Sequence, residues 1–203
     1  MSPGETAFRL CMTAALWTTW CMIHSLLNAE GIVRKTGVLD TWFKPYYRVA
    51  YSVLAAASLA FVWRLTPGEP STALWCRTGM LVPVRVVLVA ISLVLGYLSF
   101  RHIGLLDFLG LTALGIGRRG AVTSQRLITW GIYGRIRHPQ FLAGLLLLWT
   151  RDLTDTGLVI NVVLSLYLLI GARIEEKRLL AKFGGEYAVY MEKVPAFVPK
   201  LMM

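Results

Sequence analysis

The stretch that decides the fold class of this chain is MLVPVRVVLVAISLVLGYLSF, residues 80–100, in which Arg85 is the only charged residue. A helix that crosses a bilayer needs about 20 predominantly apolar residues, and this stretch supplies them. The whole chain of 203 residues is 56% hydrophobic and only 16% charged, whereas a soluble domain is about a quarter charged. The sequence therefore predicts an all-α fold, a polytopic membrane helical bundle, with residues 1–203 as a single integral membrane domain.

Other apolar segments lie on both sides of this stretch. Thr6–Leu27 and Tyr46–Leu65 precede it, and Pro139–Thr150 and Gly157–Ala172 follow it as two shorter arms. We therefore expect about five transmembrane helices. Pro139 suits the first turn of the helix that it opens. The arm beginning there is too short to cross a bilayer alone unless its helix begins earlier.

The two halves of the chain are expected to differ in role. Residues 1–100 would hold the first three transmembrane helices, and residues 101–203 would form the cofactor-binding catalytic half. Residues 101–137 are rich in Gly and Arg, which favours an interfacial helix followed by an irregular loop. Residues 175–194 place Leu, Phe and Tyr at spacings of three and four, which predicts a cytoplasmic amphipathic helix on the membrane surface.

The net charge of +10 does not indicate a nucleic-acid-binding protein, because the basic residues cluster beside apolar segments and form no single stripe. Sixteen basic residues fall on one side of the expected membrane topology and five on the other. The positive-inside rule places the larger group in the cytoplasm, where it would also meet anionic lipid headgroups. Cys11, Cys21 and Cys76 have no CxxC spacing, so we expect no disulfide framework and no metal site.

Two polar clusters enclose the shorter apolar arms. GIYGRIRHP, residues 131–139, precedes them, and Arg173-Ile174-Glu175-Glu176 follows them. Charged groups beside hydrocarbon are costly unless paired or facing a cavity, so they indicate a functional site. Arg and His suit a carboxylate or phosphate, a Glu suits a ribose diol or a cation, and the aromatic residues suit a purine. S-adenosylmethionine has a carboxylate, a nucleoside and a positive centre, but this chemistry alone does not exclude a dinucleotide.

The motif Gly131-x-Tyr133-x-x-x-Arg137-His138-Pro139-x-Phe141, followed by Glu175-Glu176-x-x-Leu179-x-x-x-Phe183-Gly184-x-x-Tyr187-x-x-Tyr190-x-x-x-Val194-Pro195, resembles the isoprenylcysteine carboxyl methyltransferase family of integral membrane methyltransferases. The resemblance covers about Gln125 to Pro199. It implies S-adenosylmethionine bound on the cytosolic side and a lipophilic or small apolar acceptor entering sideways between helices. The expected catalytic residues are Arg137, Arg173 and Glu175. The expected cofactor-binding residues are Gln125, Gly131, Tyr133, Arg137, His138, Pro139, Phe141, Glu175, Glu176 and Tyr187.

The N-terminal half resembles a particular branch of that superfamily. Trp20-Cys21-x-Ile23-His24-Ser25-Leu26-Leu27 and Tyr46-Tyr47-Arg48-x-x-Tyr51 are similar to the methanethiol S-methyltransferase and NnrU-like branch. The C-terminal motif departs from the family in two places, with Phe141 where Tyr is frequent and Ala143 where Gly is frequent. A cofactor contact made by that Tyr hydroxyl in relatives would be missing here.

Several alternatives remain at this point. The chain could be an NADPH-dependent membrane reductase of the sterol-reductase type, or an inactive membrane subunit. Arg137 and His138 could anchor a helix at the headgroups, Glu176 could cap the last helix or face solvent, and Tyr187 could serve interfacial packing. The acceptor could be a thiol, a prenyl-cysteine carboxylate or a lipid headgroup. We expect it to pass between residues 80–100 and the Pro139–Ala172 hairpin, near Gly144.

Overall fold

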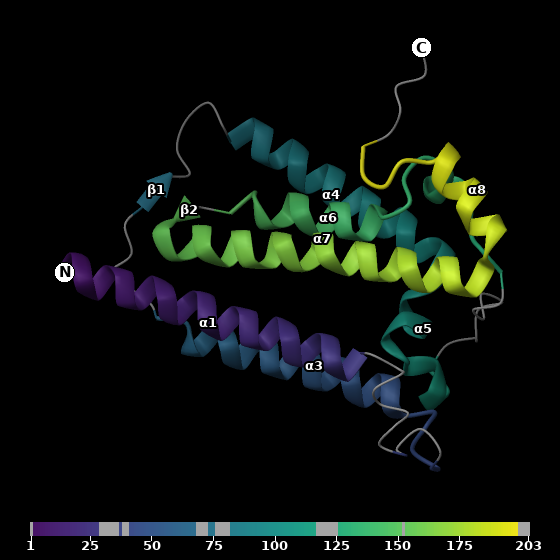
Figure 1. The fold of residues 1–203 in the computed structure, drawn as a ribbon, viewed down its shortest axis with the longest axis horizontal. Helices are drawn as coiled ribbons and strands as arrows, with labels where there is room; N and C mark the ends of the chain where they lie inside the picture. The colour runs from purple at the N-terminus through teal and green to yellow at the C-terminus, as the bar shows by residue number, and fades with distance from the viewer. Residues whose placement is uncertain are drawn as a thin grey trace. The chain divides into compact units, whose positions relative to one another are not determined.

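The computed structural model of the protein describes residues 2–28, 37, 41–67, 73–75, 82–116, 126–151 and 153–198. Within these residues the structure is helical apart from a two-stranded sheet of β1 and β2, which confirms the all-α class. The elements, labelled in Figure 1, are α1 (Pro3–Asn28), α3 (Tyr47–Leu65), β1 (Ala73–Trp75), α4 (Val82–Ile103), α5 (Leu105–Leu109), η2 (Leu111–Leu114), η3 (Gly131–Gly134), α6 (Pro139–Leu148), β2 (Leu153–Thr154), α7 (Asp155–Phe183) and α8 (Gly185–Lys193).

Four of the described helices, α1, α3, α4 and α7, are long and apolar enough to cross a membrane. The remaining apolar segment is α6, which has 10 residues and is therefore about 15 Å long. That length is half the thickness of the hydrocarbon core. Its helix begins at Pro139 and not before it. The expectation of about five membrane helices thus corresponds to four long helices and one short arm.

The described residues divide into two compact units, and α7 contributes to both of them. The first unit comprises Met1–Leu74, Leu105–Gly120 and Leu153–Leu164; the second comprises Trp75–Gly104, Ala121–Asp152 and Ser165–Met203. The expected single domain and its division at residue 100 stay predictions. In the region expected to form an interfacial helix, the structure has two short pieces, α5 and η2.

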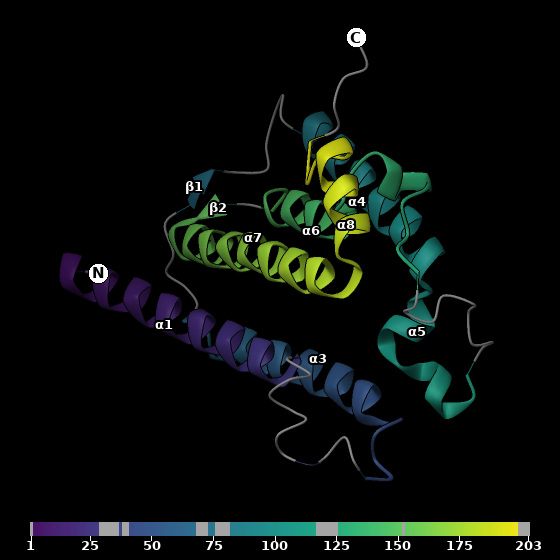
Figure 2. The same ribbon diagram turned by 45° about the vertical axis from the view of Figure 1, so that its right-hand side comes forward.

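The first unit is built on α1 and α3, which lie side by side in both views (Figure 1 and Figure 2). Trp17, Val62 and Ile160 form its buried core, so the beginning of α7 packs with both helices. The indole of Trp17 also donates a hydrogen bond to the Thr66 hydroxyl over 2.9 Å. A buried indole N–H needs such a partner, and this one fixes α1 against the end of α3.

The two N-terminal motif segments contact each other within this unit. Trp20 stacks on His24 with ring centroids 5.0 Å apart, and the Tyr51 hydroxyl lies 2.7 Å from His24 Nε2. The Tyr47 hydroxyl donates to the carbonyl of Leu27 over 2.5 Å. The residues behind the N-terminal resemblance therefore tie α1 to α3, and His24 has a structural partner.

The second unit is an antiparallel arrangement of α4, α6 and the later part of α7; Figure 2 shows α6 beside α7. A Cβ added at Gly144 would lie 3.3 Å from Leu168, and the Trp149 indole donates to the Ser165 hydroxyl over 3.1 Å. On the other face of α6, the Ser92 hydroxyl donates to the carbonyl of Ala143 over 2.6 Å. The short arm α6 is thus held between two long helices.

The helix α7 continues well beyond the apolar arm that predicted it. The expected arm ends at Ala172, whereas α7 ends at Phe183. A single amphipathic helix over residues 175–194 is therefore wrong: the chain breaks at Gly184, where φ is +54°, and α8 follows. That positive φ favours glycine, which has no Cβ to strain. Glu175 and Glu176 consequently lie on the long helix, beside α6.

Candidate functional site

The centre of the site is Arg137, which lies in the turn between η3 and α6. Its Nε and Nη2 donate to Glu176 Oε1 over 3.1 and 2.5 Å. Its Nη1 donates to the carbonyls of Met191 and Val194 over 2.9 and 2.5 Å. Arg137 thereby joins α7 to the end of α8, and four of its hydrogen bonds are made within the protein. This structure does not leave the guanidinium as a free fork for a ligand carboxylate.

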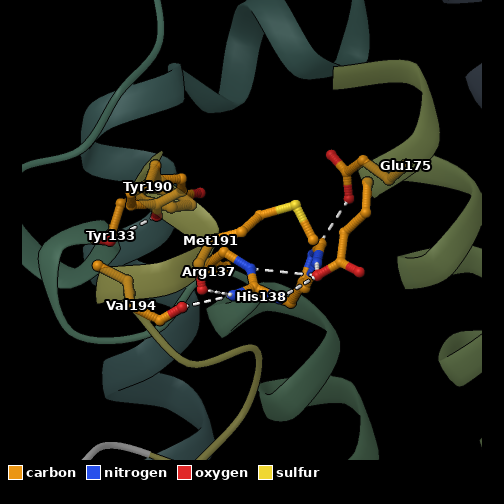
Figure 3. Close-up of polar contacts among 8 residues, drawn as sticks. Tyr133, Arg137, His138, Glu175, Tyr190, Met191 and Val194 are labelled. Carbon is orange, nitrogen blue, oxygen red and sulfur yellow. Dashed lines mark hydrogen bonds and ion pairs between the residues drawn. The ribbon is translucent and has the colours of Figure 1, made fainter. Parts of the chain in front are cut away.

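His138 is 3% exposed and lies between two carboxylates. Its Nε2 is 3.2 Å from Glu176 Oε1, and its Nδ1 is 3.4 Å from Glu175 Oε2; Figure 3 shows the contact from the His138 ring to Glu175. An ionised carboxylate only accepts hydrogen bonds, so the contact with Glu176 favours a proton on Nε2. The ring also meets Phe141 edge to face, with centroids 5.5 Å apart.

The segment after α8 runs beside the Arg-His pair. The backbone N–H of Arg137 donates to the carbonyl of Pro195, and that of His138 donates to the carbonyl of Ala196, over 2.9 and 3.0 Å. The ring of Phe197 lies 5.7 Å from the His138 ring. We call residues 194–197 the strap. It satisfies two backbone donors that precede α6, where a helix leaves its first N–H groups without internal partners.

The loop containing Tyr133 is fixed by two contacts. The Tyr190 hydroxyl donates to the Tyr133 carbonyl over 2.5 Å (Figure 3). Gly131 has a φ of +65°, and a Cβ there would lie only 2.4 Å from His102 Nε2. Gly131 therefore permits both a left-handed turn and the close approach of α4, which gives this predicted cofactor residue a structural reason of its own.

Two buried tyrosine hydroxyls near this cluster, those of Tyr133 and Tyr187, make no hydrogen bond of good geometry within the described residues. Ser99 lies near the first hydroxyl and Arg137 near the second. Burial, together with the negative charges of Glu176 and Glu175, raises the pKa of Tyr187 to about 12. Burial likewise raises the pKa of Tyr133 to about 12. Both side chains therefore stay protonated and keep an O–H donor. The amide nitrogen of Gln140 is a third buried donor without a partner in the described residues.

Of the two neighbouring glutamates, Glu176 differs from expectation. Glu176 was expected to cap a helix or face solvent, but its side chain is 8% exposed and accepts from Arg137 and His138. The Glu175 side chain is 48% exposed. Capping is excluded because Glu176 lies inside α7, far from the helix N-terminus. Glu176 therefore organises the cluster, and Glu175 is its accessible carboxylate.

The other predicted site residues fall into three groups. Pro139 is buried at the start of α6, and Phe141 packs between His138 and Gly171. Arg173 is exposed on α7 and does not take part in the hydrogen-bonded cluster. Gln125 lies outside the described residues. The roles expected for all these residues in catalysis and cofactor binding stay predictions.

The expected passage for the acceptor near Gly144 does not fit the packing. Gly144 faces Leu168 of α7, so a large side chain there would separate α6 from α7. The neighbouring Ala143 is buried with Leu95 of α4 and Ile136. Of the three positions considered for this route, only Leu147 is exposed. A substitution at Gly144 would test helix packing and not acceptor entry.

Some members of the cluster could not be selected from the sequence. The carbonyls of Met191 and Val194 are backbone groups, which carry no residue signature. Phe197 lies outside the motif, and only the structure brings it to His138. Tyr190 belongs to the quoted motif, but the sequence assigns it no role of its own. Its hydrogen bond to the Tyr133 carbonyl shows that it also positions a loop.

Comparison with known proteins supports an enzyme of methyl transfer. The chain is 29% identical over 98% of its length to methanethiol S-methyltransferase 2 of Bradyrhizobium diazoefficiens, covering 77% of that protein. It is 28% identical over 96% of its length to methanethiol S-methyltransferase 1 of the same organism, covering 68% of it. A protein of Pseudomonas deceptionensis with the name methanethiol S-methyltransferase is 35% identical over 34% of the chain and 27% of its own length.

No family model matches the chain, and no solved structure matches it significantly. The names of the relatives favour methyl transfer over the reductase and the inactive subunit. The chain is therefore a homologue of methanethiol S-methyltransferases over nearly its full length, in agreement with the resemblance of its motifs to the integral membrane methyltransferases.

Proposed function

We propose that the protein is an integral membrane methyltransferase that transfers a methyl group from S-adenosylmethionine to a small thiol of the methanethiol class. The observation that carries the proposal is the match, over nearly the whole chain, to two proteins named for that activity. The geometry supports it with a buried charged cluster beside apolar helices. A small thiol is chosen over prenyl-cysteine and lipid acceptors because of the relatives' names.

The donor set of the site fits a cationic nucleoside ligand. Glu175 offers a half-exposed carboxylate, which suits a ribose diol or a positive centre. Tyr133 and Tyr187 offer buried hydroxyls that lack ordinary partners in the described residues. Buried polar groups normally have partners, so these hydroxyls are suitable contacts for the cofactor. Arg137 is already held by Glu176, and we assign it to positioning the cluster.

The chain's own residues contribute mainly orientation and exclusion of water. When bound, S-adenosylmethionine would supply a methyl group on a positively charged sulfur. A thiol reacts as its thiolate, so the site must accept a proton during turnover. Arg137 and Glu176 fix the ring of His138, and Phe141 and Phe197 cover it. These contacts hold the polar groups in one arrangement while apolar side chains surround them.

The site is proposed to face the cytoplasm. Arg173, Lys177, Arg178 and Lys182 are exposed on the part of α7 that carries the glutamates, and they suit anionic lipid headgroups on that side. With α6 and the residues around it counted as a fifth crossing, the excess of basic residues favours an N-terminus outside and Met203 inside. A reporter fused after Met203 should be active in the cytoplasm. Activity of that fusion on the other side of the membrane would contradict this orientation.

The proposed activity is tested directly with the detergent-purified protein. Methanethiol and methyl-labelled S-adenosylmethionine should yield labelled dimethyl sulfide, and turnover with a prenyl-cysteine analogue or a phospholipid should be slower. Calorimetric titration should show binding of S-adenosylhomocysteine and not of NADPH. Binding of NADPH alone would support the reductase, and binding of neither compound would support the inactive subunit. The His138→Ala variant should lose the activity, and the exposed Glu186→Gln variant should retain it.

A further inference from the structure

The polar cluster contains one more carboxylate than its guanidinium can balance. Arg137 pairs with Glu176, and Glu175 adds a second negative charge 3.4 Å from His138 Nδ1. With a neutral imidazole and both carboxylates ionised, the three charged groups sum to one net negative charge. Water screens only part of this charge, because Glu175 is half-exposed whereas His138 and Glu176 are buried, and the unscreened part is unfavourable beside a poorly hydrated interior. One added proton, placed between Glu175 and His138, makes the cluster neutral.

The groups around this pair do not remove the imbalance. Tyr133 and Tyr187 face the cluster and stay neutral, since burial raises the pKa of each to about 12. On α7 itself, Arg173, Lys177 and Arg178 are exposed, where water and salt screen their charges. Within the described part of the second unit, Arg137 is the cation that makes hydrogen bonds to this cluster.

We infer that Glu175 and His138 act together as the acceptor of the thiol proton, so that methyl transfer is coupled to proton uptake by this pair. The inference rests on the proposed function. The thiol S–H bond breaks and its proton goes to the Glu175–His138 pair. The electron pair left on sulfur forms the new S–CH₃ bond, while the bond between the methyl group and the donor's sulfonium breaks and its electrons remain on that sulfur.

The charge of the site stays constant through this step. Before transfer, a sulfonium cation balances the negative cluster; after transfer, the donor sulfur is neutral and the added proton balances the cluster instead. Glu176 has a separate role, because its Oε1 accepts from His138 Nε2 and so directs Nδ1 toward Glu175. Glu176 and Arg137 are thus positioning residues, and Glu175 gives the pair its access to solvent.

The inference is tested by counting protons on binding, which does not depend on turnover. Calorimetric titrations in two buffers of different ionisation enthalpy give the protons taken up with each ligand. At pH 7, the protein should take up about one more proton on binding S-adenosylhomocysteine than on binding S-adenosylmethionine, because only S-adenosylmethionine carries a sulfonium charge. In Glu175→Gln, the cluster is neutral without an added proton, so the difference in proton uptake between the two ligands should fall from about one to about zero. Exposed Glu186 offers a matched control, and Glu186→Gln should behave as wild type.

A second readout is the dependence of the rate on pH. At pH 7, Glu175→Gln should turn over methanethiol at least tenfold more slowly than wild type. The deficit should shrink as rising pH ionises the thiol in solution, because the substrate then arrives as thiolate. A deficit that is constant with pH would contradict a role in proton transfer.

The outcomes separate this inference from the proposed function. If wild type forms dimethyl sulfide but shows the same proton uptake with both ligands, the inference is overturned and the function stands. If wild type binds neither ligand, the proposed function fails. If Glu175→Gln no longer binds the ligands, the wild-type difference decides alone: about one proton supports the inference and about zero overturns it.

Discussion

The helix α7 carries a buried ion pair near each of its ends, and the two pairs are built differently. Asp155, the first residue of α7, pairs with Arg9 of α1. Glu176, near the other end, accepts from Arg137 and His138 and has the accessible Glu175 beside it. The contact described for the first is between one carboxylate and one guanidinium. The second has an additional carboxylate and an imidazole.

On the proposal above, this difference distinguishes an ion pair that stabilises the fold from a cluster that takes up a proton. Asp155 also accepts from the backbone N–H of Thr156 over 2.7 Å, so its hydrogen bonds fix the start of a helix. This pair holds α1 to the start of α7. The cluster at Glu176 combines buried charged groups with one additional carboxylate, that of Glu175, which is half-exposed. On the proposal above, the site differs from a structural ion pair in its additional carboxylate and not in burial alone.

The largest expected effect is on stability when Glu176 is removed. Glu176→Ala leaves the buried Arg137 guanidinium without its carboxylate, which should lower the free energy of unfolding by about 3–5 kcal/mol. The neighbouring Glu175→Ala serves as a control, because an exposed side chain should change it by no more than about 0.5 kcal/mol. Denaturant titration in detergent micelles measures both. Equal losses in the two variants would contradict the assignment of Glu176 as the organising residue.

Breaking the pair at the other end should cost nearly as much, but the loss should be recoverable. Asp155→Ala should lower the free energy of unfolding by about 3 kcal/mol. The double variant Arg9→Met and Asp155→Leu should return to within about 1 kcal/mol of wild type, since apolar residues can replace a buried pair that has only a structural role. The same titration measures both variants. A double variant as unstable as the single one would assign this pair a further role.

Cofactor affinity should distinguish the two ends next. His138→Ala and Glu175→Ala should each weaken S-adenosylhomocysteine binding at least tenfold, because losing a charge-assisted contact costs about 1.5–3 kcal/mol. Arg137→Lys should also weaken it, since an ammonium cannot reproduce the planar donor arrangement. The apolar double variant at Arg9 and Asp155 should bind within about twofold of wild type. Calorimetry on correctly folded protein gives these affinities. Unchanged binding in His138→Ala and Glu175→Ala would show that the cofactor binds elsewhere.

The smallest effect concerns two tyrosines of α8. Tyr190→Phe removes the hydrogen bond to the Tyr133 carbonyl and should lower the free energy of unfolding by about 1 kcal/mol. Tyr187→Phe should change it by less than about 0.5 kcal/mol, because that hydroxyl makes no ordinary hydrogen bond within the described residues. Tyr187→Phe should instead weaken S-adenosylhomocysteine binding. The opposite pattern would show that Tyr187 stabilises the fold and does not meet the cofactor.

The apolar segments of the fold were predictable because the requirement for about 20 apolar residues acts locally. The expected Tyr46–Leu65 corresponds to α3 at Tyr47–Leu65, and residues 80–100 correspond to α4 at Val82–Ile103. The end of α7 was not predictable in this way. Its helix continues through charged residues after Ala172, and hydropathy falls there although the backbone hydrogen bonding does not change.

The charged side chains of the candidate site were predictable, but their roles were not. The spacing of Arg137, His138 and the two glutamates indicated that they would meet. Which glutamate is buried depends on the orientation of α7 relative to the turn before α6, a long-range contact that no local pattern records. The backbone carbonyls that hold Arg137 and the ring of Phe197 are likewise fixed by the path of the chain after α8.

The strap determines when, during translation, the polar cluster can form. The N–H groups of Arg137 and His138 donate to the carbonyls of residues 195 and 196, and Phe197 covers the imidazole. Translation must therefore pass Phe197 before this arrangement can exist, long after α1, α3, α4 and α6 have left the ribosome. A nascent chain already inserted in the membrane would remain without the closed cluster until translation has passed residue 197, and the proposed activity could begin only after that point.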